Sequence, residues 1–179
     1  MRVFISGGCK NGKSTFAQRV AKNLSGPYPL YYIATMEPHD QEDLDRINRH
    51  LKEREGWGFE TIECGRNILE CLTKGKAEGS YLLDSVTALL SNEMFHIDGT
   101  MDFSSSERVA DELISLSRQV DNIVFVSDYI YSDAFIYDET TEKYRQGLAY
   151  IDKALARECE CVIEVCGANI IYHKGGLSL

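Results

Sequence analysis

Near the start of the chain, glycine, lysine and serine follow one another at the spacing of a phosphate-binding loop. The run Gly7-Gly8-Cys9-Lys10-Asn11-Gly12-Lys13-Ser14 matches the pattern G-x-x-x-x-G-K-[ST]. Glycine permits backbone angles that a β-carbon disfavours, so successive N–H groups can turn toward phosphate oxygens. Lys13 supplies a cation for the β- and γ-phosphates, and the Ser14 hydroxyl is a ligand for Mg²⁺. We therefore predict that this loop, together with Thr15, binds a nucleoside triphosphate, and that Lys13 is also catalytic.

The segments on either side of the loop support this interpretation. The alternative is a glycine-rich turn with a solvated lysine, which the same letters produce by chance. Residues 1–6 are mostly apolar and predict a strand before the loop. Apolar residues at helical spacing follow the loop, at Phe16, Ala17, Val20, Ala21 and Leu24. A strand, a glycine-rich turn and a helix in this order are the context that the motif requires.

Asp84 is a candidate second ligand for Mg²⁺. It ends the apolar run Tyr81-Leu82-Leu83, and the carboxyl ends of parallel strands face the ligand crevice of an α/β sheet. A carboxylate there can hold Mg²⁺ opposite Ser14, directly or through water. The alternative is that Asp84 caps the helix that begins near Val86. The sequence leaves both roles open.

His50 lies on a charged helix that we predict from about residue 40 to residue 55. Arg46 and Arg54 stand four residues before and after it, so the three side chains share one helix face. Nearby cations favour the neutral imidazole and attract phosphate, which makes His50 a candidate nucleophile and both arginines candidate nucleotide-binding residues. The alternative is a partly exposed histidine in a salt-bridged helix. Beside it runs an apolar stripe that we expect to be buried, made by Leu44, Ile47 and Leu51.

The rest of the chain predicts the elements that must position these residues. Strands are expected near residues 1–6, 30–35, 59–63, 81–85, 123–127, 161–166 and 170–173. Helices are expected after the phosphate loop and near residues 40–55, 66–73, 86–95, 104–119 and 140–158. Strands that alternate with helices at this pace indicate right-handed crossovers and a mainly parallel α/β sheet with helices on both faces. We expect residues 1–179 to form a single domain.

Composition argues against several classes of protein. A net charge of −9 disfavours a general binder of nucleic acid or anionic membranes, since either function requires a basic face. No apolar run approaches the length of a membrane span. The six cysteines match no zinc-binding spacing, and we expect free thiols in the cytoplasm.

A segment rich in tyrosine and aspartate, residues 128–138, has little periodicity and predicts a loop beside the site. Its tyrosines have two interpretations, because they can stack on a large planar ligand or pack locally. They are Tyr129, Tyr131 and Tyr137.

Several segments, taken together and in order, resemble the adenosylcobinamide kinase/adenosylcobinamide-phosphate guanylyltransferase family (CobU). They are the phosphate loop, Tyr32-Ile33-Ala34-Thr35, Arg46-Ile47-Asn48-Arg49-His50, and Leu82-Leu83-Asp84-Ser85-Val86-Thr87 with Ser91-Asn92. The resemblance is good over about residues 3–95 and looser beyond them. After the strand at 123–126 the family usually has Asn-Glu-Val-Gly, whereas this chain has Ser127-Asp128-Tyr129-Ile130. Asp128 thus stands where the family has glutamate.

The resemblance implies a homotrimer of P-loop NTPase domains with a RecA-like sheet, acting on a corrinoid with ATP, GTP and Mg²⁺. In one activity a nucleoside triphosphate gives its γ-phosphate to a hydroxyl of cobinamide. In the other, His50 attacks the α-phosphate of GTP, expels pyrophosphate and passes GMP to cobinamide phosphate. The resemblance assigns the phosphate loop to the nucleotide, and Ser14 and Asp84 to Mg²⁺.

Two further functions remain open on the sequence. One is a P-loop kinase that acts on another small alcohol. The other is a regulatory module without catalysis, in which a bound triphosphate orders residues 128–138.

Overall fold

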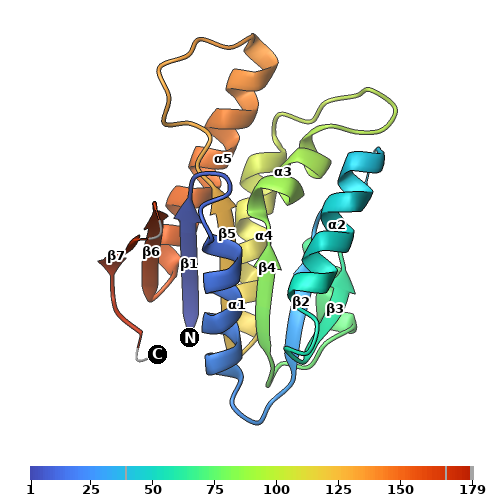
Figure 1. Cartoon of the computed structure of the whole chain (residues 1–179). Coiled ribbons are helices and arrows are strands. Elements are labelled where there is room, and N and C mark those ends of the chain that lie inside the picture. The colour runs from blue at the N-terminus through green and yellow to red at the C-terminus, as the bar shows by residue number, and fades with distance from the viewer. Residues whose placement is uncertain (39, 168, 178–179) are drawn as a thin grey trace.

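The computed structural model describes residues 1–38, 40–167 and 169–177, with the side chains of residues 46 and 53 left out. These residues form a seven-stranded sheet flanked by helices (Figure 1). The strands are β1 (Arg2–Gly7), β2 (Leu30–Ala34), β3 (Phe59–Glu63), β4 (Ser80–Asp84), β5 (Asn122–Asp128), β6 (Cys161–Cys166) and β7 (Asn169–Lys174). Their order in the sheet is β3-β2-β4-β5-β1-β6-β7.

The pairing confirms the predicted mainly parallel sheet. Strands β1 to β6 run parallel to their neighbours, and β7 pairs antiparallel with β6. The parallel strands therefore end at one edge, where Gly7 lies opposite Asp128 and Ala34 lies opposite Asp84. Strand β5 separates β4, which ends in Asp84, from β1.

Helices cover both faces of the sheet. In Figure 1, α1 (Lys13–Ser25) and α2 (Gln41–Glu53) lie in front of it, and α4 (Ser105–Gln119) and α5 (Glu139–Glu158) lie behind it. The helix α3 (Val86–Met94) packs with α4 and α5. Because strand side chains alternate, Val3 and Ile5 pack on the α1 side while Phe4 and Phe125 pack on the other. Burial on both faces explains the continuous apolar runs of the strands.

The helix predicted near residues 66–73 is a 3-10 helix, η1 (Ile68–Thr73). Ile68 and Cys71 are both buried, and the three-residue period of a 3-10 helix places them on the same side. Among the described residues, none of the helices combines the length and apolarity needed to cross a membrane.

The apolar face of α2 departs from its prediction. The side chains of Leu44 and Leu51, expected to be buried, are 43% and 44% exposed. Together with Ile47 they border a cavity near the carboxyl ends of the strands. The prediction of a buried stripe is wrong, because helical periodicity reveals an apolar face but not what covers that face.

Trp57, the single tryptophan of the chain, follows α2. Its backbone N–H donates to the carbonyl oxygen of Arg54 at 3.1 Å. The Nζ atom of Lys22, on α1, lies 5.4 Å from the centroid of its indole ring. The indole therefore lies between the end of α2 and the surface of α1.

Candidate active site

The phosphate loop connects β1 directly to α1 and is held by its own short-range contacts. Gly12 caps α1 with a φ of 86°, a left-handed conformation that glycine adopts without strain. The side chain of Asn11 accepts from the backbone N–H of Lys13 at 3.2 Å and donates to the carbonyl of Val165. A β-carbon at Gly7 would lie 2.5 Å from that same carbonyl oxygen, so the loop's first position requires glycine.

The Lys13 side chain is tied to protein oxygens. Its Nζ donates to the carbonyl of Gly8 at 3.1 Å and forms an ion pair with Asp128 at the end of β5. The side chains of the pair are only 8% and 14% exposed. Asp128 is fixed in turn, because its N–H donates to Thr87 Oγ1 at 2.9 Å. A triphosphate bound to this loop would have to compete with Asp128 for the lysine.

A second carboxyl group lies behind this pair. Asp152, on α5, is buried and accepts a hydrogen bond from Tyr131 Oη at 2.8 Å. Burial raises its pKa to about 7, and the charge of Asp128 raises it further, while hydrogen bonds from Tyr131 and Ser127 act in the opposite direction. The P-loop side of the sheet therefore holds a carboxyl group that stays protonated well above the usual range.

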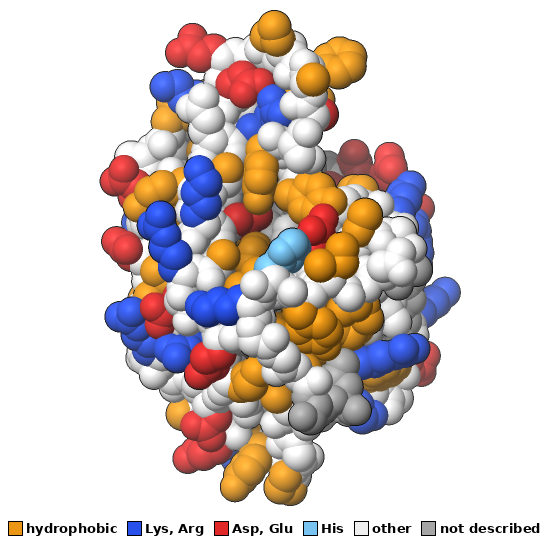
Figure 2. Space-filling model, turned by 90° about the vertical axis from the view of Figure 1, so that its left-hand side faces the viewer, with side chains coloured by type: hydrophobic (Ala, Val, Ile, Leu, Met, Phe, Trp, Pro, Cys, Tyr) orange, Lys and Arg blue, Asp and Glu red, His pale blue; other side chains and the backbone are white. Residues whose placement is uncertain are grey.

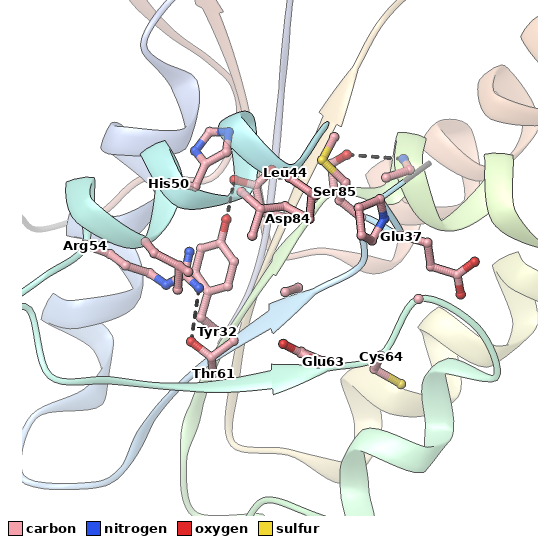
Figure 3. Close-up of a pocket in the computed structure, with 17 residues that line it drawn as sticks. Tyr32, Glu37, Leu44, His50, Arg54, Thr61, Glu63, Cys64, Asp84 and Ser85 are labelled. Carbon is pink, nitrogen blue, oxygen red and sulfur yellow. Dashed lines mark hydrogen bonds between the residues drawn. The ribbon is translucent and has the colours of Figure 1, made fainter. Parts of the chain in front are cut away.

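The cavity under α2, which we call the α2 cavity, has a volume of about 470 Å³. It is bounded by α2 and by the carboxyl ends of β2, β3 and β4 (Figure 3). His50, Arg54 and Asp84 all line it, although they come from three parts of the fold. Its walls combine these polar groups with apolar side chains, which come from Met36, Pro38, Leu44, Ile47 and Leu51.

Arg54 is fixed over the floor of the α2 cavity. Its guanidinium carbon lies 4.0 Å from the ring centroid of Tyr32, and its Nη2 donates to Thr61 Oγ1 at 3.1 Å (Figure 3). Arg54 is buried, and stacking on an aromatic face is favourable for a guanidinium. A buried cation beside His50 makes this cavity attractive to a phosphate group.

Asp84 faces the α2 cavity and does not cap α3. Its Oδ2 accepts a hydrogen bond from Tyr32 Oη at 3.0 Å. The cap of α3 is Ser85, whose Oγ accepts from the backbone N–H of Ala88 at 3.2 Å. The capping alternative for Asp84 is therefore wrong by one residue, and the carboxylate lies at the edge where ligands bind.

Two polar residues fasten the strand ends around the cavity. Thr35 Oγ1 donates to the carbonyl of Ser85 at 2.8 Å and accepts from its N–H at 2.7 Å. The buried Asn92 Nδ2 donates to the carbonyls of Thr35 and Gly65 at 2.7 and 2.8 Å. These bonds join the chain just after β2, β3 and β4, so the segments that resemble the family also build the rim of the cavity.

The oxygen donors near the strand ends fit Mg²⁺. Ser14 is half-buried in the first turn of α1, and Asp84 offers a carboxylate. Among the described residues, no group of three or more His, Cys, Asp or Glu side chains could hold a metal alone. Mg²⁺ suits such a place, because it usually binds one or two protein oxygens and completes its shell with substrate phosphates and water.

The predicted site residues thus fall into two groups. Residues 7–15 form the phosphate loop, in which Cys9, Lys10 and Thr15 are exposed. His50, Arg54 and Asp84 share the α2 cavity, and Ser14 is not among its lining residues. Arg46 lies on α2, but its side chain is outside the described residues.

Sequence reasoning missed Tyr32 and Thr61 as parts of the cavity. Both lie on strands, where apolar and β-branched residues are ordinary. The only signal was that Tyr32 opens the Tyr-Ile-Ala-Thr segment on which the family resemblance rests.

The three loop tyrosines make local contacts. Their hydroxyls donate to carboxylates, Tyr129 to Glu164, Tyr131 to Asp152 and Tyr137 to Asp133. Free thiols are found at all six cysteines, of which Cys9 and Cys166 are exposed. Burial raises the pKa of Cys64, which lines the α2 cavity, so its thiol stays protonated.

Comparison with solved structures identifies the fold. Flagellar accessory protein FlaH from Methanocaldococcus jannaschii aligns with a TM-score of 0.51 and 14% identity, over 97% of this chain and 78% of FlaH. A solved ATPase domain gives 0.51 and 12%, over 97% and 76% of the two chains. PH0250 from Pyrococcus horikoshii OT3 gives 0.54 and 10%, over 99% and 87%. The fold is that of a P-loop NTPase with a RecA-like sheet.

Comparison of sequences gives the family. No individual curated protein matches the chain. The model of the family described as cobinamide kinase / cobinamide phosphate guanyltransferase matches residues 3–170, which is nearly the whole chain. The chain therefore belongs to the cobinamide kinase / cobinamide phosphate guanyltransferase family.

Proposed function

We propose that the protein is a bifunctional kinase and guanylyltransferase that acts on adenosylcobinamide and adenosylcobinamide phosphate in cobalamin nucleotide-loop assembly. One observation carries the proposal: His50, Arg54 and Asp84 line one cavity at the sheet edge that also bears the phosphate loop. A nucleophile, a phosphate-binding cation and a metal-binding carboxylate in one cavity suit nucleotidyl transfer.

In the guanylyl transfer, a ring nitrogen of His50 attacks the α-phosphorus of GTP. A phosphorus–nitrogen bond forms, the bond between the α-phosphorus and its bridging oxygen breaks, and pyrophosphate leaves. A phosphate oxygen of adenosylcobinamide phosphate then attacks the same phosphorus and releases His50. Arg54 offsets the charge on the phosphate oxygens during both steps.

In the kinase reaction, the acceptor hydroxyl attacks the γ-phosphorus of ATP or GTP, and the nucleoside diphosphate leaves. Lys13 and the loop N–H groups hold the phosphates. Mg²⁺, held by Ser14 and Asp84, offsets the phosphate charge.

The test is a covalent label. Incubation with α-³²P-GTP and Mg²⁺ should give protein-bound label that is acid-labile and alkali-stable, and His50→Gln should abolish it. His173→Gln is the matched control, since His173 lies on β7 in an exposed ion pair with Glu164 and should label like the wild type. Absence of label from the wild type, or full labelling of His50→Gln, contradicts the guanylyltransferase.

A parallel assay with γ-³²P-ATP and adenosylcobinamide isolates the kinase. His50→Gln should retain this activity. If the wild type phosphorylates adenosylcobinamide but forms no histidine label, the protein is a kinase alone. If it binds triphosphate without either reaction, it is a regulatory module.

The proposal also includes a homotrimer in the cytoplasm. The edge strand β7 exposes Ile170, Ile171 and Tyr172, and Figure 2, which views the molecule from this side, shows hydrophobic side chains gathered at the surface. Such an edge is suited to contact another chain. Light scattering after gel filtration should give three times the chain mass, and a monomer mass overturns this part.

A further inference from the structure

Tyr32 lies between the two charged groups of the α2 cavity (Figure 3). It is 3% exposed and contacts both groups with different parts of its side chain. Its ring face carries the Arg54 guanidinium at 4.0 Å, and its hydroxyl donates to Asp84 Oδ2 at 3.0 Å. The edge-on ring of Phe59, at 5.8 Å and 88°, supports the ring on the β3 side.

Each contact restricts one functional group. The hydrogen bond to Oδ2 limits rotation of the Asp84 carboxylate. The ring face limits the Arg54 guanidinium to a plane, within which the bond to Thr61 Oγ1 at 3.1 Å selects one orientation. A guanidinium has five N–H donors, and this bond occupies one of them.

We propose that Tyr32 is a positioning residue that orients Asp84 toward Mg²⁺ through its hydroxyl and presents Arg54 to the nucleotide phosphate through its ring. This inference rests on the proposed function, because it takes Asp84 as a metal ligand and Arg54 as a phosphate ligand. It predicts that the two roles can be separated. The hydroxyl controls the requirement for metal, and the Thr61 bond controls affinity for the nucleotide.

The experiment measures binding of α,β-methylene-GTP, which does not react at the α-phosphorus, by calorimetry at a series of Mg²⁺ concentrations. Tyr32→Phe should raise the Mg²⁺ concentration for half-maximal binding about tenfold, the effect of losing one hydrogen bond to a charged group. Thr61→Val should weaken binding at saturating Mg²⁺ by roughly five- to tenfold and leave the Mg²⁺ midpoint unchanged.

Tyr31→Phe is the matched control. Tyr31 is the preceding residue on β2, is equally buried at 3% exposure, and points to the opposite face, where it stacks on Tyr81 at 4.8 Å. It should bind the analogue like the wild type. A general loss of packing would lower the melting temperature of either tyrosine variant without shifting the Mg²⁺ midpoint.

An unchanged Mg²⁺ midpoint in Tyr32→Phe overturns the inference, as does an equal shift of that midpoint in Thr61→Val. Should Tyr32→Phe not fold, wild-type affinity in Thr61→Val still overturns it. The binding assay does not require His50 to react. A wild type that binds the analogue but forms no covalent label contradicts the proposed function alone, whereas a labelled wild type with a normal Tyr32→Phe midpoint contradicts only the role of Tyr32.

Discussion

The phosphate loop and the α2 cavity lie at the same edge of the sheet, but they are built in different ways. The loop is one short segment between β1 and α1, and its lysine already has a buried ion-pair partner. The cavity is assembled from α2 and three strands, and its wall leaves Leu44 and Leu51 more than two-fifths exposed. The loop is therefore completed by local backbone geometry, whereas the cavity depends on residues distant in sequence.

The largest effect should come from the loop. Lys13→Ala should lower the rates of both the kinase and the guanylyl transfer by about 100-fold or more, because a charge that stabilises the transferred phosphates is lost. Lys10→Ala, at an exposed position of the same loop, should change either rate by no more than about threefold. Measured rates with γ- and α-labelled triphosphate decide the matter. If only one reaction falls in Lys13→Ala, the cavity does not share its nucleotide phosphates with the loop.

Asp128→Asn should separate loop stability from loop function. Removing one member of a largely buried ion pair leaves Lys13 without its counter-charge, which should destabilise the protein by on the order of 3 kcal/mol in urea unfolding without nucleotide. Saturating triphosphate should recover much of this loss, since its phosphates replace the carboxylate. Glu160→Gln removes an acid that pairs with Arg2 at an exposed position and should cost less than about 1 kcal/mol. Equal losses in the two variants would mean that the Lys13 pair is no stronger than a surface pair.

Asp152 gives a pH dependence that belongs to the loop side of the sheet. Its folded pKa of about 7 exceeds the unfolded value of about 3.9. The native state therefore binds more protons between these values, and the contribution of this group, full below about pH 4, is lost as pH rises to about 7.

Asp152→Asn cannot ionise and should be more stable than the wild type at pH 8 by about 2 kcal/mol, with a flatter profile from pH 5 to 8. Unfolding curves at both pH values measure this change. Asp111→Asn, at an exposed position of α4, should leave the profile as it is. A wild-type slope in Asp152→Asn would contradict the assignment.

The smallest effect on stability should come from the cavity wall. Leu51→Ala should cost less than about 1 kcal/mol because the side chain is already 44% exposed. Leu89→Ala, in the core, should cost about 2–5 kcal/mol. The comparison becomes sharper if Leu51→Ala nonetheless raises the KM for GTP or the corrinoid severalfold. A stability loss as large as that of Leu89→Ala would show that α2 packs as a core helix.

The same contrast explains how far the sequence could be interpreted. The phosphate loop and the parallel sheet were predictable because their signals are local spacing and continuous apolar strands. The environment of Leu44 was not, since it depends on which strands end beneath α2. Tyr32 owes its role to Arg54 and Asp84, residues 22 and 52 positions away in the chain, and no local pattern encodes such a meeting. Asp84 and Ser85 exchanged the expected cap because both are good N-caps at adjacent positions.

Trp57 gives the protein an intrinsic optical reporter. Its indole emission can be excited selectively, since the chain has one tryptophan, and the Lys22 ammonium over the ring makes the emission sensitive to the separation of α1 from the end of α2. One helix begins at the phosphate loop and the other carries His50. A stopped-flow trace of this single fluorophore would therefore time the relative movement of the two halves of the site without any added dye.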